Sequence, residues 1–190
     1  MALRCFVAID LDNPALLDTL EGIQASMIRT GADLKCVERD NIHVTLKFLG
    51  DVREELIGEL IRRVSEISFK PFNVELKGVG VFPSLRRPRV VWAGISEGKE
   101  ELKEVFQILE SELTGIGFKP EKRRFSPHIT IARIRSGRNR DHLVKVLLDR
   151  ENEKLGDFNV ESIRLKKSVL TPKGPIYSTL AESKVSNTTT

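Results

Sequence analysis

The sequence predicts a duplicated α+β fold, and two observations point to it. Strand-like and helix-like segments occur in both halves of the 190-residue chain. A short histidine motif also occurs once in each half, first as His43–Leu46 (HVTL) and then as His128–Ile131 (HITI). Two of only three histidines therefore stand in one pattern, which indicates a repeat, although the halves share no other sequence that can be aligned by eye.

The first half is predicted to run strand, helix, strand, helix. Asn13 followed by Pro14 is typical of a helix start, and Gly31 of a helix end. We expect Gly50-Asp51 to end the motif strand, and Asp51 with Glu54 to begin the next helix as a capping box. The segments are a strand at 4–10, a helix from 14 to 31, a short segment at 34–37, the motif strand at 42–49 and a helix from 51 that ends before Pro71.

The second half is predicted to contain more strands than helices. The expected strands are 72–76, 81–82, 90–95, the second motif strand from about 125, 157–170 and 176–180, and the helices are 100–113 and 141–148. The loop Pro83–Arg89 carries three arginines, and it either overhangs a phosphate cleft or is a plain hairpin loop. The polar tail, residues 182–190, is expected to be disordered.

The spacing within each motif predicts where its polar side chains point. Residues two apart share one face of a strand, so His43 with Thr45, and His128 with Thr130, should point away from the flanking aliphatic residues. Two such strands that face each other would line a cleft with two histidines and two threonines.

Paired histidines suit acid–base catalysis on a phosphodiester. Opening a cyclic phosphodiester needs a base for the attacking water and an acid for the departing sugar oxygen. Histidine, with an ordinary pKa of about 6.5, serves either role near neutral pH, and threonine hydroxyls can donate to the non-bridging oxygens. The motifs hold no carboxylate at ligand spacing and no covalent nucleophile, so we expect no metal and no other cofactor.

Composition favours a cytoplasmic globular protein. The hydrophobic content of 40% is enough for an ordinary core, the apolar runs are too short to span a bilayer, and the N-terminus lacks a signal-peptide pattern. Cys5 and Cys36 show no zinc or disulfide pattern, so both are predicted to be buried thiols. We expect a monomer without a membrane partner.

A basic tract surrounds the second motif. It contains eight basic residues against one acid, Glu121: Lys119, Lys122, Arg123, Arg124, Arg133, Arg135, Arg138 and Arg140. A basic surface beside a site attracts a polyanion, although such a run can also be plain solvated surface. Next to a motif suited to phosphate chemistry, the phosphate interpretation is favoured.

The residues around both motifs resemble a known family. The strings Asn41–Gly50 (NIHVTLKFLG) and Phe125–Arg133 (FSPHITIAR) are similar to the 2H phosphoesterase superfamily, and most to its LigT/ThpR branch. These are the RNA 2′,3′-cyclic phosphodiesterases, also called 2′-5′ RNA ligases. The resemblance extends from Arg4–Asp10 to Gly174–Tyr177. It implies two lobes in one domain, residues 1–181, each lobe an antiparallel sheet covered by helices, with the active cleft between the sheets.

The resemblance also implies a reaction and its residues. RNA ends with a 2′,3′-cyclic phosphate would be hydrolysed to a 2′-phosphate by catalytic His43 and His128, with Thr45 and Thr130 binding the phosphate. We assign His43 as the acid for the 3′ oxygen and His128 as the base for water, a choice that the nearly symmetrical sequence leaves open. Run backwards, the same pair would join a cyclic phosphate end to a 5′-hydroxyl through a 2′-5′ link.

Phe48 and Arg133 are expected to bind substrate, because the resemblance implies a phenylalanine that stacks on the base and an arginine that engages the nucleotide. Strict alternation would point both away from the cleft, so each strand must end or bulge before this residue. The alternatives are a core phenylalanine and a surface arginine.

Two other functions remain open. One is a 2H phosphodiesterase for a small nucleotide, such as a cyclic ADP-ribose derivative or 2′-5′ oligoadenylate. The other is a nucleotide- or RNA-binding module without catalysis. The basic tract favours RNA ends, and the intact histidines and threonines favour catalysis.

Overall fold

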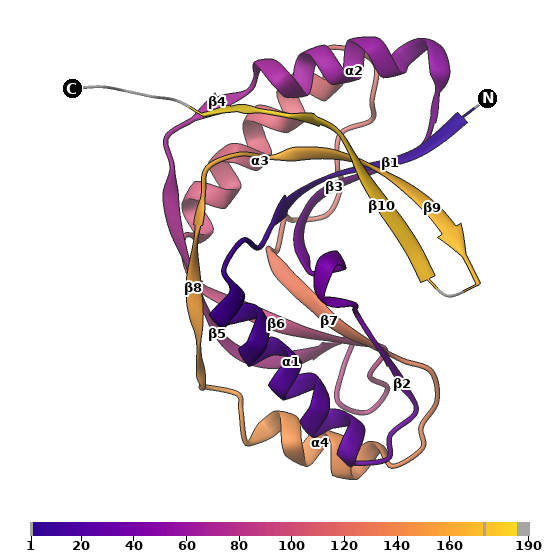
Figure 1. Cartoon of the computed structure of the whole chain (residues 1–190), viewed down its shortest axis with the longest axis vertical. Helices are drawn as coiled ribbons and strands as arrows, with labels where there is room; N and C mark the ends of the chain where they lie inside the picture. The colour runs from indigo at the N-terminus through magenta and orange to yellow at the C-terminus, as the bar shows by residue number, and fades with distance from the viewer. Residues whose placement is uncertain (1, 173, 186–190) are drawn as a thin grey trace.

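The fold is mixed α+β, as predicted. The computed structural model describes residues 2–172 and 174–185 (Figure 1). The helices are α1 (Pro14–Arg29), α2 (Glu54–Glu66), α3 (Lys99–Thr114) and α4 (Arg140–Leu148), with a 3-10 turn at Arg39–Asn41. The strands are β1 (Ala2–Asp10), β2 (Leu34–Cys36), β3 (His43–Arg53), β4 (Ser68–Phe69), β5 (Phe72–Phe82), β6 (Val90–Glu97), β7 (His128–Ile134), β8 (Lys154–Val160), β9 (Arg164–Thr171), β10 (Gly174–Glu182) and β11 (Lys184–Val185).

Most of the strands form one antiparallel sheet in the order β10-β9-β1-β3-β7-β6-β5-β8, with β2 beside β7. Its two parts meet between β3 and β7, which are joined through the pair Val44 opposite Ile129. We call β10-β9-β1-β3 the His43 half, and β7-β6-β5-β8 with β2 the His128 half. The two lobes expected from the sequence therefore share one sheet (Figure 1).

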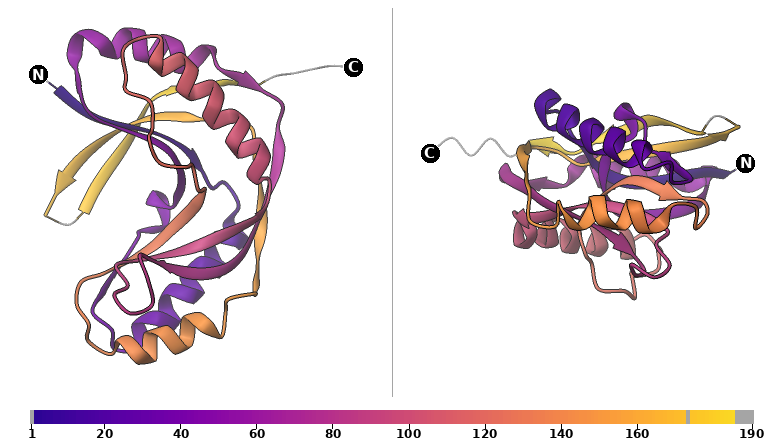
Figure 2. Two further views of the ribbon diagram at one scale, coloured as in Figure 1. Left: turned by 180° about the vertical axis from the view of Figure 1, so that it is seen from behind. Right: turned by 90° about the horizontal axis from the view of Figure 1, so that it is seen from below.

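The chain crosses between the two halves more than once. Helix α1 follows β1 but packs against β7 and β8 of the His128 half, where α4 packs on β5. Helix α2 contacts β3, β9 and β10 of the His43 half and lies beside α3 (Figure 2). Because β9 also pairs with β1, the two halves of the structure are not the two halves of the sequence.

The first motif strand continues beyond its predicted end. Gly50 has a positive φ of 70° at a register irregularity, and pairing with β1 continues until Ala2 lies opposite Arg53. Gly50 therefore marks a bulge rather than a strand end. Helix α2 starts after Arg53 without a side-chain cap, so the capping box predicted for Asp51 and Glu54 is wrong.

The C-terminal region also differs from the prediction. The expected strand at 157–170 is two strands, because β8 pairs with β5 and β9 pairs with β1 in the other half, and residues 161–163 connect them. The disordered tail expected from Glu182 is wrong for its first residues: Glu182 ends β10, and Lys184–Val185 pair with β4. Residues 186–190 lie outside the described residues.

The core lies between the sheet and its helices. Val44 and Ile129, the aliphatic residues at the centre of the motifs, are fully buried, as are Leu20 of α1 and Leu109 of α3. Cys5 is buried as predicted and Cys36 is half-buried. No helix within the described ranges combines the length and apolar character needed to cross a membrane.

We expect Asn13→Ala to lower the free energy of unfolding by about 1 kcal/mol. The Asn13 side chain accepts hydrogen bonds from the backbone N–H groups of Ala15 and Leu16, at 3.0 and 3.3 Å, so it caps α1 as predicted. It also donates to the Asp157 carbonyl at 2.8 Å. Urea denaturation of both proteins measures the difference. Asn13→Asp, which keeps the cap acceptor, should lose less, and an equal loss in both variants would contradict the capping role.

Candidate active site

The two motifs start their strands and meet at the joint of the sheet. His43 is the first residue of β3 and His128 the first of β7. Because Val44 pairs with antiparallel Ile129, extending the register by one residue brings His43 opposite Thr130 and Thr45 opposite His128. The motif aliphatics are buried, whereas these four polar residues are half-buried, as alternation predicts. The structure thus places all four at the joint between the two halves of the sheet.

Both imidazoles are held in the same way. Nδ1 of His43 lies 2.7 Å from the Asn41 carbonyl oxygen, and Nδ1 of His128 lies 2.8 Å from the Ser126 carbonyl oxygen. A carbonyl only accepts, so each Nδ1 must carry the hydrogen and donate it. Each neutral ring therefore keeps the lone pair of Nε2 for proton transfer.

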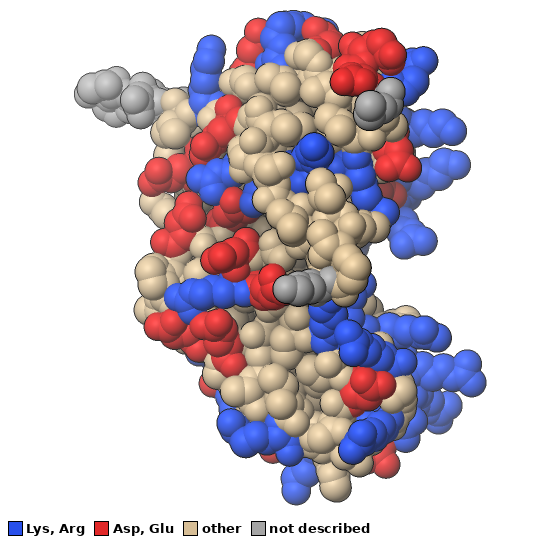
Figure 3. All heavy atoms as spheres, turned by 45° about the vertical axis from the view of Figure 1, so that its right-hand side comes forward, with Lys and Arg blue, Asp and Glu red and all other residues tan. Residues whose placement is uncertain are grey.

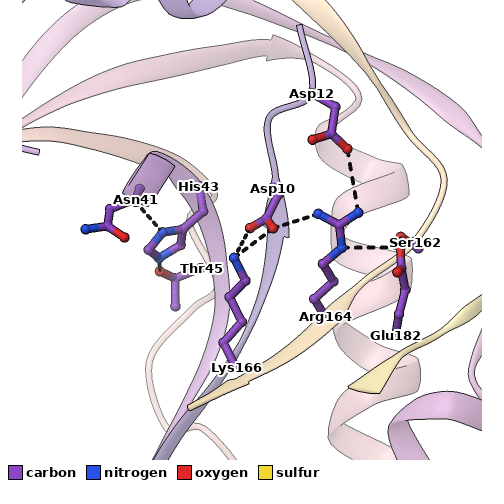
Figure 4. Close-up of polar contacts among 9 residues, drawn as sticks. All are labelled: Asp10, Asp12, Asn41, His43, Thr45, Ser162, Arg164, Lys166 and Glu182. Atoms are coloured by element: carbon purple, nitrogen blue, oxygen red, sulfur yellow. Dashed lines mark hydrogen bonds and ion pairs between the residues drawn. The ribbon is translucent and has the colours of Figure 1, made fainter. Parts of the chain in front are cut away.

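His43 has the more enclosed surroundings. Its Nε2 is 2.9 Å from the Thr45 hydroxyl, which donates to the neutral ring (Figure 4). The rings of Phe6 and Tyr177 have centroids 5.2 and 5.6 Å from that of His43. Burial lowers the pKa of His43, and its hydrogen bond to Asn41 opposes this effect. The environment thus favours neutral His43 in the free protein.

A partly buried ion-pair network supports the strands beside His43. Asp10 pairs with His43 in the β1–β3 register, and its carboxylate accepts from Lys166 at 2.5 and 2.7 Å and from Arg164 at 2.7 Å (Figure 4). Burial alone would raise the pKa of Asp10, but these hydrogen bonds and positive charges outweigh it and lower that pKa. The carboxylate therefore remains ionised beside His43, and it offsets part of the charge of Lys166.

We expect the imidazole of His43 to titrate below its ordinary pKa of about 6.5. The unfolded chain then binds more protons than the folded protein between the two values. The contribution of His43 to the free energy of unfolding is therefore complete above about pH 6.5 and falls as the pH drops toward the folded value. A heteronuclear NMR titration, with His43→Ala to assign the signal, measures this pKa. A value at or above 6.5 would contradict the burial argument.

A bulge in β3 turns Phe48 toward the histidine side. The pairing with β1 shifts between Thr45 and Lys47, so that Leu46 has no partner of its own. Leu46 and Lys47 are both buried, and Phe48 is 70% exposed. The centroid of the Phe48 ring lies 6.1 Å from that of Phe6, which also contacts His43. Of the two conditions under which Phe48 could face the cleft, a strand end or a bulge, the structure has the bulge.

The second motif strand contains the matching bulge. The pairing of β7 with β6 shifts between Thr130 and Ala132, leaving Ile131 as the extra residue. Ile131 and Ala132 are both fully buried, and Arg133 is exposed. The positive charge of Arg133 opposes the raised pKa of Tyr177 of β10, a strand of the His43 half.

Basic residues surround the site. All eight residues of the predicted basic tract are exposed. In the space-filling view, Lys and Arg side chains project along the right-hand edge, above and below the indentation between the two halves (Figure 3). Among the described residues, no group of three or more His, Cys, Asp or Glu side chains is placed to hold a metal ion.

Several residues of the site were not predicted from sequence. Phe6 and Tyr177 pack on His43, and the Phe82 ring has its centroid 5.0 Å from that of His128. Burial raises the pKa of Tyr177, while the charges of Arg133 and Arg4 oppose the shift. Only their aromatic character could have indicated these residues as part of the site. The strand order that brings them together cannot be predicted from local sequence patterns.

A bent antiparallel sheet with a histidine–threonine pair on each side of its joint defines a two-histidine phosphoesterase. The model of the LigT-like phosphoesterase family matches residues 10–92 and 94–177, and each stretch contains one motif. The chain therefore belongs to the LigT-like phosphoesterase family.

Individual relatives agree with this assignment. An RNA 2′,3′-cyclic phosphodiesterase of Aeropyrum pernix is 44% identical over 172 residues, which cover 90% of this chain and 98% of the relative. One from Methanothermobacter thermautotrophicus is 40% identical over 184 residues, covering 94% and 96%. The crystal structure of E. coli LigT complexed with 3′-AMP has a TM-score of 0.77 at 26% identity, covering 98% of this chain and 99% of LigT. LigT complexed with NADP⁺ has a TM-score of 0.75 at 27% identity, with coverages of 95% and 96%.

Proposed function

We propose that the protein hydrolyses 2′,3′-cyclic phosphates at RNA ends to 2′-phosphates by acid–base catalysis without a metal ion. The observation that carries the proposal is the pair of imidazoles on either side of the Val44–Ile129 pair, each with Nδ1 bound to a carbonyl, so that Nε2 is the nitrogen that can transfer a proton. The names of the curated relatives support the same substrate.

The surroundings of the histidines favour distinct roles. His128 bonds to exposed Ser126, so water reaches it more easily, and we assign it as the base that takes a proton from the attacking water. His43, enclosed by Phe6 and Tyr177, is the acid that protonates the departing 3′ oxygen. Water attacks phosphorus, the bond from phosphorus to the 3′ oxygen breaks, and the 2′-phosphate remains.

The lowered pKa of His43 means that His43 can act as the acid only if it gains a proton before the reaction. The acid must be protonated when the reaction begins, whereas burial favours its neutral form in the free protein. A cyclic phosphate carries a negative charge, and an opposite charge nearby raises the pKa of an imidazole. Binding of substrate would therefore load the proton on His43, and inorganic phosphate should raise its pKa in the same NMR titration.

The threonines and the flanking residues would bind the substrate. Once His43 is protonated, its Nε2 no longer accepts from Thr45, so Thr45 and Thr130 can both donate hydroxyl hydrogen bonds to the non-bridging oxygens, where charge builds up in the transition state. Phe48 offers an exposed ring on which the base can stack, and Arg133 offers a cation on the same side. The basic residues around the opening would attract the preceding RNA phosphates.

The same site can also join two RNA ends. A 5′-hydroxyl that replaces water as the nucleophile yields a 2′-5′ phosphodiester, and the two histidines keep their roles. This second activity needs room for another nucleotide in the cleft.

The test is hydrolysis of a short RNA that ends in a 2′,3′-cyclic phosphate, in the presence of EDTA, with the product followed by phosphorus NMR. We expect a 2′-phosphate and no 3′-phosphate. Activity that EDTA abolishes would overturn the metal-free mechanism. A mononucleotide 2′,3′-cyclic phosphate in a parallel assay distinguishes RNA ends from small nucleotides: a higher kcat/KM for the mononucleotide would move the assignment to the latter.

A further inference from the structure

An aromatic surface lies beside His128 and is separate from the one beside His43. The Phe82 ring meets the His128 ring edge-on at 5.0 Å, and Trp92 packs against Phe82 with centroids 5.2 Å apart. Trp92 pairs with Thr130 in the β6–β7 register, so its indole starts directly beside the motif. Phe82 is 37% exposed.

Glycine makes room for this surface. A Cβ atom at Gly80 would come within 2.3 Å of the Trp92 ring, so the indole lies across Gly80 of the neighbouring strand β5. The indole Nε1–H is buried and has no hydrogen-bond partner among the described residues, so packing alone holds the ring. Phe82 and Trp92, whose rings are tilted by 34° to each other, therefore form an apolar surface next to His128, which we call the Phe82 floor.

Positive charge accompanies the Phe82 floor. The loop Pro83–Arg89 begins directly after Phe82 and closes where the Arg89 N–H donates to the Phe82 carbonyl at 2.7 Å. Arg86, Arg87 and Arg89 are all exposed. The Arg86 carbonyl also accepts from Arg140 at 3.1 Å, which brings one more arginine to this loop.

The site therefore has two surfaces that could each bind a nucleotide, one on each side of its histidine pair. On the His43 side, exposed Phe48 is accompanied by the charge of Arg133. On the His128 side, the Phe82 floor is accompanied by the arginine loop. Aromatic rings stack on bases of any sequence, and arginines pair with phosphates. A cyclic phosphate end has its base and its upstream chain on one side of the reacting phosphorus, so it would occupy only one of these surfaces.

We propose that the Phe82 floor binds the base of a second nucleotide, the one whose 5′-hydroxyl attacks the cyclic phosphate. This inference rests on the proposed function, and it assigns the Phe48 surface to the cyclic phosphate end and the Phe82 floor to the acceptor. The arginine loop then binds the phosphates that follow the acceptor nucleotide.

The roles of the two histidines agree with this placement. His128, which touches Phe82, takes the proton from the 5′-hydroxyl. The 5′ oxygen bonds to phosphorus, the bond from phosphorus to the 3′ oxygen breaks, and the 3′ oxygen receives a proton from His43. One phosphodiester bond replaces another, so no further reactant is needed. Water and the acceptor thus compete for the same side of the phosphorus.

The experiment measures this competition. A short RNA with a 2′,3′-cyclic phosphate is incubated with an acceptor oligonucleotide that has a 5′-hydroxyl, and the ratio of 2′-5′ joined product to 2′-phosphate is determined. A second acceptor is abasic at its 5′ residue. We expect the wild-type protein to favour the acceptor that has a base. In Phe82→Ala the ratio should fall about 10-fold, and the preference for the base should disappear.

Leu85→Ala is the matched control, because Leu85 is an exposed apolar residue of the same loop. Its ratio should match that of the wild type. A variant that only loosens the fold lowers both products together and leaves their ratio unchanged. The inference is overturned if Phe82→Ala shifts the ratio no more than Leu85→Ala, if the abasic acceptor is joined equally well, or if the wild type hydrolyses but never joins. A wild type that forms neither product would instead overturn the proposed function.

Discussion

His43→Ala and His128→Ala should each lower kcat/KM for cyclic phosphate hydrolysis by roughly 10²- to 10⁴-fold. Each change removes one Nε2 from the pair that lies across the joint of the sheet. Steady-state rates on an RNA with a 2′,3′-cyclic phosphate measure the loss. The double variant should lose less than the product of the single losses, because groups that act as a unit are not additive.

The third histidine provides the control for these variants. His142 is exposed on α4, away from both motifs, so His142→Ala should retain wild-type activity. Thermal unfolding of all the variants establishes that the activity losses are not losses of the folded protein. Activity within twofold of the wild type in either motif variant would remove the histidine pair from the mechanism.

Lys47→Met should lower the free energy of unfolding by about 3 kcal/mol. The Lys47 side chain is 6% exposed, and its ammonium group binds the Glu110 carboxylate and the Lys119 carbonyl, the latter at 2.9 Å. Methionine fills the volume but leaves Glu110, at 15% exposure, without its partner. The loop before His128 also loses the bond from Lys47 to its Lys119 carbonyl, while the Glu121 N–H still donates to the other oxygen of Glu110 at 2.7 Å.

An exposed ion pair is the matched control for Lys47. Arg62 binds Glu59 and Glu66 on the surface of α2 with half of its side chain exposed, and solvent screens such pairs. Arg62→Met should therefore change the urea midpoint little. Equal shifts of the urea midpoint for the two variants would show that burial does not make the loss of the Lys47–Glu110 pair more costly.

Local patterns were enough to predict the motif residues. The histidine–threonine spacing is a period of two, so the faces of Thr45 and Thr130 follow from alternation alone, and the Asn13 cap follows from one residue and its proline neighbour. The bulges at Leu46 and Ile131 do not follow, because a bulge depends on the partner strand rather than on its own sequence. The site residues that could be predicted were thus those that a pattern of neighbouring residues identifies.

These local patterns could not predict contacts between distant parts of the chain. Tyr177 reaches His43 only because β10 pairs with β9 and β9 with β1. The division of 157–170 into β8 and β9 has the same origin, since each part pairs with a strand of a different half. Strand order in a sheet is a tertiary property, and alternation along one strand carries no information about its neighbour.

The pairing of β1 with β9 has a consequence for the newly synthesised chain. A ribosome makes β3 and β7 well before β9 and β10, but Lys166 and Tyr177, which lie in these last two strands, complete the surroundings of His43. Until they emerge, Asp10 lacks its cation and one face of the His43 ring lacks its cover. A nascent chain therefore holds both histidine motifs before the surroundings of His43 are complete, and we expect phosphodiesterase activity only after Tyr177 has emerged from the ribosome.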